Sequence, residues 1–418
     1  MYSAVQALPG STNVPSPGPT LRVMHHLGWW PFFLGMVLAA PVLQLRGEVE
    51  GPLVLATPGL LVEGRGAVLR GDKGHTLSLL APGIRVRGLT VVGAGPGDDF
   101  FEPDAAIYLR GCRGCLLEGI RVEGAPTAVR MEDSPRAVVR GLRAKGLGES
   151  PGVLVYGSPG VRVEGSHLLG YMDAVYVEYS PDMVIRDNLL EGNGRYGFHV
   201  MFSWGVRVEG NQSLRNGIGN AVMHGAENRV VGNLLAGQGS PVGYGLLVQD
   251  ERGTRVEANR FQENTLGLVL MDAQGVEVKG NRFQENGTAL RITRERGGNS
   301  AWVEGNAFQG NLYDLLVDDP EAEAKVVGNR YDRASGLPVP HLPTGSFALL
   351  LARQPELSLF ALSPGVLLWE AAEAQVPGLR LVALADPKAE PLARETRPHG
   401  GWLFLGLLGG VLWWRWRA

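Results

Sequence analysis

The stretch GFHVMFSWGVRVEGNQSLRNGIGNAVMHGAENRVVGN, residues 197–233, decides the fold of this chain of 418 residues. It contains the segment VEGN at 208–211 and, 22 residues later, the segment VVGN at 230–233. Segments of this pattern recur at steps of 22 to 31 residues, beginning at residues 86, 117, 139, 163, 185, 208, 230, 256, 278, 303 and 326. Repetition at a nearly fixed period is typical of solenoids, in which each repeat forms one structural unit.

Each repeat also carries a short strand directed at the interior. Eight positions before the repeat segment every residue is apolar, and two positions earlier still every residue except Asn220 is apolar. The two columns are Leu109, Met131, Val155, Val177, Val200, Val222, Val248 and Leu270, and Ile107, Val129, Val153, Val175, Phe198, Asn220, Leu246 and Leu268. A period of two residues is that of a β-strand with one face in the core.

Small and polar residues mark the corners of the repeats. Five positions before the segment lie Cys112, Ser134, Ser158, Ser180, Ser203, Gly225, Glu251 and Ala273, and the fourth segment residue is asparagine at 188, 211, 233, 259, 281, 306 and 329. Glycine is abundant, with 60 residues, and both glycine and asparagine suit tight corners. The sequence therefore predicts an all-β fold, a right-handed parallel β-helix over residues 52–331. A helical solenoid is disfavoured, because its units need helical patterns with few glycines.

The two ends of the chain predict export and membrane association. Residues 1–26 form a disordered or mis-started leader, and the uncharged apolar stretch 27–45 indicates a signal peptide or anchor. Residues 400–418, apolar and closed by two arginines, indicate a C-terminal membrane anchor. Between the β-helix and this anchor, residues 337–397 contain helical spacing at 346–361 and 365–376, which predicts a short helical C-terminal tail that caps the solenoid and docks a partner.

The repeats also carry a family resemblance. The runs GYMDAVYVEYSPDMVIRDNLLEG (170–192), YGFHVMFS (196–203) and AVMHGAENRV (221–230) resemble the NosD family, and the resemblance extends over about residues 51–330. It implies a non-enzymatic protein in the periplasm or on the outer face of the cytoplasmic membrane. This protein would deliver copper, with or without sulfur, for assembly of the copper centre of nitrous oxide reductase. The implied partners are an ABC transporter ATPase and permease of the NosF and NosY type, a copper chaperone lipoprotein and the reductase.

Four residues of adjacent repeats are candidate Cu(I) ligands: His199, Met201, Met223 and His224. Met201 and Met223 share the outward column seven positions before the segment, so they should stack ~4.8 Å apart, between Glu178 on one side and Gln249 and Met271 on the other. His199 lies on the same face, and His224 follows Met223 at the corner. Thioether sulfur and imidazole suit soft Cu(I). Alternatively, the methionines form an apolar outer row covered by a loop or partner.

Cys112 and Cys115 form a C-x-x-C motif at one corner, several repeats away from His199. Two thiolates at this spacing could hold Cu(I) or cycle as a redox pair. Cys112 also falls in the column of small corner residues, so a structural role is an equal alternative.

Composition and charge bear on the other classes of function. A net charge of −3 argues against nucleic acid as a partner. A polysaccharide-binding or polysaccharide-degrading β-helix is the main alternative, but it would show an exposed aromatic stripe, and the outward columns carry Tyr156, Tyr176 and Tyr179 only locally. The carboxylates Asp98, Asp99, Glu102 and Asp104, and Asp173, Glu178 and Asp182, are expected to be solvated rather than catalytic. A passive scaffold between transporter and reductase is the third possibility.

Overall fold

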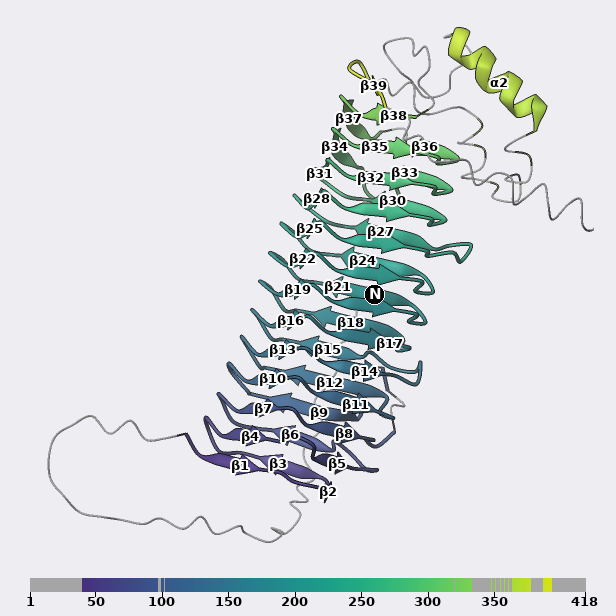
Figure 1. Cartoon of the computed structure of the whole chain (residues 1–418). Coiled ribbons are helices and arrows are strands. Elements are labelled where there is room, and N and C mark those ends of the chain that lie inside the picture. The colour runs from purple at the N-terminus through teal and green to yellow at the C-terminus, as the bar shows by residue number, and fades with distance from the viewer. Residues whose placement is uncertain are drawn as a thin grey trace, which may run out of the picture. The chain divides into compact units, whose positions relative to one another are not determined.

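The computed structural model describes residues 40–96, 99–100, 102–319 and 321–332, single positions between 347 and 360, and residues 363–376 and 386–392. Over this part the chain winds as a parallel β-helix, in which each coil adds one strand to each of three sheets (Figure 1). Every strand pairs in parallel with its counterpart in the neighbouring coils, for example Met201 with Met223. The predicted all-β solenoid is confirmed.

The three sheets run along the solenoid and are named A, B and C. In the described residues, sheet A contains β1 (Val42–Gln44), β4 (Leu61–Glu63), β7 (Arg85–Arg87), β10 (Leu116–Glu118), β13 (Val138–Arg140), β16 (Arg162–Glu164), β19 (Val184–Arg186), β22 (Arg207–Glu209), β25 (Arg229–Val231), β28 (Arg255–Glu257), β31 (Val276–Lys279), β34 (Ser300–Glu304) and β37 (Glu323–Val327). Sheet B contains β2 (Glu48–Glu50), β5 (Val68–Arg70), β8 (Thr90–Val92), β11 (Arg121–Glu123), β14 (Arg143–Lys145), β17 (His167–Leu169), β20 (Leu189–Glu191), β23 (Gln212–Leu214), β26 (Leu234–Ala236), β29 (Arg260–Gln262), β32 (Arg282–Gln284), β35 (Ala307–Gln309), β38 (Arg330–Tyr331) and β39 (Glu390–Pro391). Sheet C contains β3 (Leu53–Leu55), β6 (Leu77–Leu79), β9 (Ala105–Arg110), β12 (Thr127–Glu132), β15 (Val153–Tyr156), β18 (Asp173–Glu178), β21 (Tyr196–Met201), β24 (Gly219–Met223), β27 (Tyr244–Gln249), β30 (Leu266–Met271), β33 (Thr288–Thr293) and β36 (Tyr313–Val317).

The β-helix begins earlier than the sequence pattern indicated. Strand β1 lies within the stretch 27–45 and pairs with β4, and β2 also precedes residue 52. The alternate residues Leu43, Leu45 and Val49 pack against the core, as strand residues do, so the predicted boundaries at 45 and 52 are corrected. Residues 1–39, which include the leader and most of the predicted signal or anchor, lie outside the described part of the chain, as do residues 400–418.

Parts of the segment that follows the β-helix are described. Helix α2 (Pro364–Gln375) falls on the predicted helical spacing at 365–376, and Ser363 caps its N-terminus. Strand β39 pairs with β38 and so extends sheet B. The predicted helix over 346–361 lies almost entirely outside the described residues. None of the helices in the described ranges has the length and apolar character required to cross a membrane.

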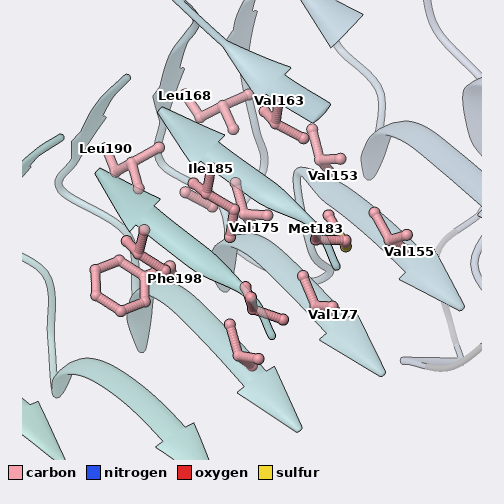
Figure 2. Packing of buried hydrophobic residues seen from close by; sticks show 14 of the residues in the cluster. Val153, Val155, Val163, Leu168, Val175, Val177, Met183, Ile185, Leu190 and Phe198 are labelled. Atoms are coloured by element: carbon pink, nitrogen blue, oxygen red, sulfur yellow. The ribbon is translucent and has the colours of Figure 1, made fainter. Parts of the chain in front are cut away.

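The predicted inward columns form one continuous core. Val155, Val177, Val200 and Phe198 are fully buried, and neighbouring coils stack the same positions on one another (Figure 2). Asn220, the polar exception, is also buried. Its side-chain amide donates to the carbonyl oxygen of Gly245 at 2.8 Å, and its Oδ1 accepts from the backbone N–H of Phe198 at 3.1 Å. These hydrogen bonds offset the cost of burying the amide.

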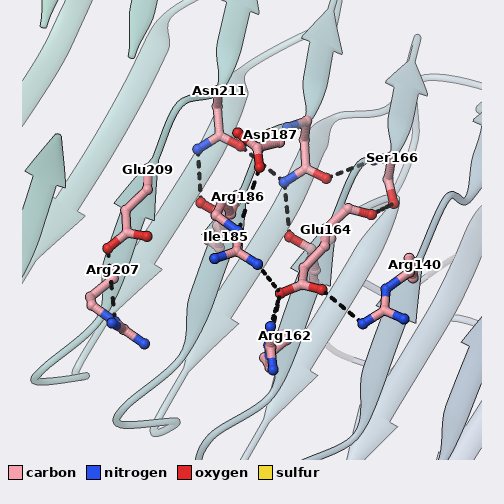
Figure 3. Close-up of polar contacts among 12 residues, drawn as sticks. Arg140, Arg162, Glu164, Ser166, Ile185, Arg186, Asp187, Arg207, Glu209 and Asn211 are labelled. Carbon is pink, nitrogen blue, oxygen red and sulfur yellow. Dashed lines mark hydrogen bonds and ion pairs between the residues drawn. The ribbon is translucent and has the colours of Figure 1, made fainter. Parts of the chain in front are cut away.

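The predicted asparagine column forms a hydrogen-bonded ladder between sheets A and B (Figure 3 shows Asn211). The backbone N–H of Asn211 donates to Oδ1 of Asn233 at 2.8 Å, and its side-chain amide donates to the carbonyl oxygen of Ile185 at 2.8 Å. The ladder ends at Asp386, whose carboxylate accepts from the backbone N–H of Asn329 at 2.9 Å. A second ladder, which the sequence reasoning missed, lies five residues further along each coil and consists of Asn193, Asn216, Gln238, Asn264, Asn286 and Asn311.

Candidate functional site

The outer face of sheet C carries the predicted methionine column. Glu178, Met201, Met223, Gln249 and Met271 are in register across β18, β21, β24, β27 and β30. Met201 and Met223 are therefore direct neighbours, and both are partly exposed. This confirms the predicted register, which places the two methionines opposite each other on adjacent strands. The hydroxyl of Tyr176 lies 3.7 Å from the sulfur of Met201 and 3.0 Å from Oε2 of Glu178.

His199 occupies the neighbouring outward column but is buried, with 6% of its surface exposed. Its imidazole lies between the rings of Tyr176 and Tyr196, with ring centroids 5.1 and 4.5 Å away. Nδ1 lies 3.1 Å from Oδ2 of Asp173. Because an ionised carboxylate only accepts, this contact assigns the proton to Nδ1. Nε2 has no hydrogen-bond partner among the described residues.

Asp173 is fully buried, in contrast to the solvated carboxylate expected from the sequence. Arg195 reaches it from the next coil and donates through Nε at 2.8 Å and through a second guanidinium nitrogen at 2.5 Å. Burial lowers the pKa of Arg195, but the hydrogen bonds and charge of Asp173 outweigh it, so the pKa of Arg195 is raised. The ring of Phe100, from the insertion before β9, covers the guanidinium at 4.8 Å. The ion pair therefore anchors the orientation of His199.

His224 lies at the corner beside Met223 and not in the column of His199. Its backbone has a positive φ of 58°, and its Nδ1 lies 3.0 Å from Oδ2 of Asp250. The ring stacks on Phe202 with centroids 4.9 Å apart. The structure thus brings His199, Met201, Met223 and His224 onto two adjacent coils, with one imidazole buried and the other partly exposed.

Aromatic rings follow one another along this corner. The row consists of Tyr156, Tyr179, Phe202 and His224, with successive centroids 5.7, 5.2 and 4.9 Å apart. The last three have positive φ angles, a conformation that costs a residue other than glycine ~1–2 kcal/mol. The aromatic residues thus continue over four adjacent coils, along the corner as well as the outward column. The signal was the position six residues before the repeat segment, where glycine and aspartate give way to tyrosine, phenylalanine and histidine.

A pocket of about 600 Å³ opens at the N-terminal end of this aromatic row. It is lined by Glu102, Tyr108, Arg110, Arg130, Glu132, Asp133, Leu154, Tyr156, Tyr176, Glu178 and Tyr179. The phenol of Tyr108 donates to Oε2 of Glu132 at 2.7 Å, and Nε of Arg130 donates to Oε1 of the same carboxylate at 2.7 Å. Burial and the hydrogen bond to Glu132 raise the pKa of Tyr108 to about 12, so the phenol stays protonated at neutral pH. Sequence reasoning missed this pocket, which is built from four coils and the insertion.

Cys112 and Cys115 form a disulfide and are fully buried. Their sulfur atoms lie 3.0 and 3.3 Å from the carbonyl oxygen of Ala81, inside the core cluster. In this form neither sulfur is a thiolate, and neither is accessible from the outer face of sheet C. Burial of the disulfide in the core favours the structural alternative, in which Cys112 belongs to the column of small corner residues, whereas Cu(I) binding or redox cycling would require the reduced pair.

Two observations bear on metal binding at this face. Among the described residues, no group of three or more histidine, cysteine, aspartate or glutamate side chains is placed to hold a metal ion. Met223 and Met271 also pack against an apolar cluster of Tyr196, Ala221, Leu247 and Val269 on the outer face, as the alternative reading of an apolar row expects.

The fold and this outer face define a parallel β-helix protein with its candidate ligand groups on one sheet. Residues 139–333 match the sequence model of the NosD family, described as periplasmic copper-binding protein (NosD). The match covers the coils from β13 to β38 and confirms the resemblance to this family.

Solved structures of other β-helix proteins are also similar to the chain. The Azotobacter vinelandii mannuronan C-5 epimerase AlgE6 A-module is 14% identical, with 66% of this chain and 85% of that one covered and a TM-score of 0.49. The catalytic domain of a GH87 alpha-1,3-glucanase, in complex with tetrasaccharides, is 12% identical, with 69% and 64% covered and a TM-score of 0.51. At 12% identity the likeness to the glucanase domain shows the fold alone. No curated protein sequence matches the chain significantly.

Proposed function

We propose that this chain is a periplasmic accessory protein that binds Cu(I) on the outer face of sheet C and passes it on. The observation that carries the proposal is the pair Met201 and Met223, two partly exposed thioethers on adjacent strands, beside an imidazole whose Nε2 is unpartnered in the described structure. The match to a family described as periplasmic copper-binding supports it. Copper is the cargo here, and the protein performs no reaction of its own.

The ligand chemistry suits a transfer site. Thioether sulfur and neutral imidazole bind soft Cu(I) without adding charge, so they do not retain Cu(II) or Zn(II) strongly. His199 is oriented by Asp173, and His224 by Asp250, each through Nδ1. A carboxylate in this position fixes the tautomer that leaves Nε2 for the metal. Cu(I) held by Met201, Met223 and one of these imidazoles would be exchangeable with a partner protein.

The recipient in this proposal is nitrous oxide reductase, whose copper centre the cargo, with or without sulfur, helps to build. A copper chaperone lipoprotein supplies Cu(I), and an ABC transporter ATPase and permease work beside the β-helix at the outer face of the cytoplasmic membrane. The resemblance to NosD proteins supports these partners, since it includes the coils that carry Met201 and Met223.

Cu(I) binding tests the site directly. Competition with a colorimetric Cu(I) chelator should show one tightly bound ion in the purified protein, and the double variant Met201→Leu/Met223→Leu should bind about a hundredfold more weakly. Met271→Leu is the matched control, because Met271 lies in the same column and packs on the same apolar cluster but has Gln249 and Thr293 as neighbours. The site assignment fails if the wild-type protein binds no Cu(I), or if the double variant binds as tightly as Met271→Leu.

Delivery is tested in cells that make nitrous oxide reductase. A strain carrying the double variant should yield reductase with a low copper content, whereas the Met271→Leu strain should yield fully loaded enzyme. A low copper content in a strain that lacks the protein, but not in the double-variant strain, would support a scaffold role and exclude these methionines from transfer.

A further inference from the structure

The aromatic row at the corner of sheet C is not required by the turn it occupies. In five other coils the same position is held by Gly111, Asp133, Gly157, Asp250 and Asp272, all with positive φ. Glycine and aspartate are the residues that adopt this conformation most easily. Tyr179, Phe202 and His224 replace them in three consecutive coils, and Tyr179 remains 48% exposed. A strained, exposed aromatic side chain points to a ligand rather than to folding.

Two rings of this row also line the pocket. Tyr156, itself 48% exposed, meets the ring of Tyr179 edge to face, and both border the cavity of about 600 Å³. Both rings are about half exposed, and the polar lining residues range from exposed, as at Asp133, to partly buried, as at Arg130 and Glu132. Such a combination of aromatic walls with a few fixed polar groups is typical of small-ligand sites of this size.

The polar groups in the pocket are held in place by one another. Glu132 accepts from both Tyr108 and Arg130, and the hydroxyl of Tyr176 contacts Glu178. The ring of His75 stacks behind Tyr108 at 4.2 Å. These contacts hold the carboxylates of Glu132 and Glu178 and the guanidinium of Arg130 in place before a ligand binds. A ligand would therefore lose little free energy to the ordering of these side chains.

The charge of the lining limits what the ligand can be. Four carboxylates, from Glu102, Glu132, Asp133 and Glu178, face two guanidinium groups, from Arg110 and Arg130. This excess of negative charge disfavours polyanions, including nucleic acids and uronic acid polymers. The volume exceeds that needed for one amino-acid side chain. A ligand with flat apolar faces, hydrogen-bonding groups such as hydroxyls and no negative charge would complement this lining.

We propose that this pocket and the rings of Tyr156, Tyr179 and Phe202 bind a neutral oligosaccharide, at a site that adjoins the proposed Cu(I) ligands through Tyr176 and Phe202. Sugar rings would lie against the aromatic faces, and their hydroxyl groups would hydrogen-bond to Glu132, Glu178 and Arg130. The inference does not rest on copper transfer, because none of its groups is a thioether or an imidazole.

Calorimetry on the metal-free, full-length protein tests the inference. The probes are neutral cello-oligosaccharides and N-acetylated chito-oligosaccharides, with alginate oligosaccharides as the anionic comparison. At least one neutral probe should bind, and alginate should bind more weakly or not at all. The variant Tyr179→Gly should raise the dissociation constant about tenfold, since it removes one stacked ring.

Tyr179→Gly places at this corner the residue found one coil earlier, so the backbone should keep its conformation and thermal stability should not fall. Ala258→Gly is the matched control, because Ala258 has the same backbone conformation, with φ 53°, and carries no ring. A second variant, Tyr156→Thr, removes the other rim ring from the end of β15. The inference is overturned if no neutral probe binds, if alginate binds more tightly, or if both tyrosine variants bind as the Ala258→Gly protein does.

Discussion

The outer faces of sheets A and C belong to the same coils, but the side chains of sheet A form ion pairs along the face and those of sheet C do not form such a row. On sheet A, Glu118, Arg140, Glu164, Arg186 and Glu209 alternate in register along five strands. Arg140 lies 3.4 Å from Glu118 and 3.3 Å from Glu164, and Arg186 lies 2.9 Å from Glu164, so these charges are balanced between neighbouring coils (Figure 3 shows the contacts of Glu164). On sheet C, thioethers, rings and carboxylates replace this alternation.

The difference teaches where to look for a site on a repetitive fold. A face whose side chains satisfy one another along the repeat leaves little for a ligand. Sheet C instead breaks the repeat on its outside, and there the described structure leaves His199 Nε2 without a partner and two tyrosine rings half exposed. The proposed Cu(I) ligands and the proposed saccharide site both lie on this face.

The largest expected effect concerns a carboxylate on sheet C. Asp173 is fully buried and binds Arg195 through two hydrogen bonds, so Asp173→Ala leaves a partly buried guanidinium and the Nδ1 of His199 unpaired. We expect a loss of about 3–5 kcal/mol in the free energy of unfolding, measured by urea titration. Arg110→Ala, at an exposed position on β9 of the same face, is the control and should change stability by less than about 0.5 kcal/mol. Similar losses of stability in the two variants would mean that the buried ion pair of Asp173 contributes no more than an exposed side chain of the same face.

A second prediction concerns the corner that joins the two faces. Glu251 is fully buried there, where other coils have serine, glycine or alanine, and burial raises its pKa from 4.5 to about 7. Between these pH values the folded protein binds a proton that the unfolded chain has released, so stability should fall as pH rises through this window, by up to about 3 kcal/mol. In Glu251→Gln this slope should disappear.

The measurement for Glu251 is the urea midpoint at pH 5 and pH 8, compared between wild type and variant. Glu304→Gln, at an exposed position on β34, should keep the wild-type slope. If Glu251→Gln also keeps it, another group titrates in this range and the buried carboxyl is not its source.

Much of the fold could be predicted because each feature repeats once per coil. The inward columns, the ladder through Asn211 and the neighbourhood of Met201 and Met223 all follow from aligning the copies on one segment. The second ladder carries the same kind of signal, an amide side chain five residues after the first, and was detectable although Gln238 interrupts its asparagines.

The site could be predicted only in part because its decisive contacts do not repeat. His199 is buried by Tyr176 and Tyr196, from different coils, and Arg195 is covered by Phe100 of an insertion absent from other coils. The direction of a side chain at positive φ, as in Phe202, also does not follow from strand periodicity. Strand register predicts which residues are neighbours. The residues that depart from the repeat, such as Phe100 and Tyr196, determine how exposed those neighbours are.

The smallest expected effect concerns sheet A, where the charge ladder should matter little. Burial raises the pKa of Glu164, but the hydrogen bonds and charges of Arg162, Arg140 and Arg186 outweigh it, so its pKa is below the ordinary value of 4.5. Its stabilising effect is therefore present above pH 4.5 and is lost as the pH falls through the lowered value. Glu164 itself is buried, but its three arginine partners are 40 to 49% exposed and Gln can keep part of their hydrogen bonding, so we expect Glu164→Gln to cost only ~1 kcal/mol at pH 7.

This cost should shrink in acid and in high salt, since protonation removes the charge of Glu164 and ions screen its partners. The measurement is urea titration at pH 7 with and without 1 M NaCl, which shortens the screening length to roughly 3 Å. The loss caused by Glu164→Gln should shrink in salt, whereas the loss caused by Asp173→Ala should change little, because salt screens buried charges much less. A loss for Glu164→Gln as large and as salt-resistant as that for Asp173→Ala would remove the distinction between the two faces. Each face would then contain one carboxylate that is essential for stability. Sheet C would differ from sheet A only in its thioethers and aromatic rings.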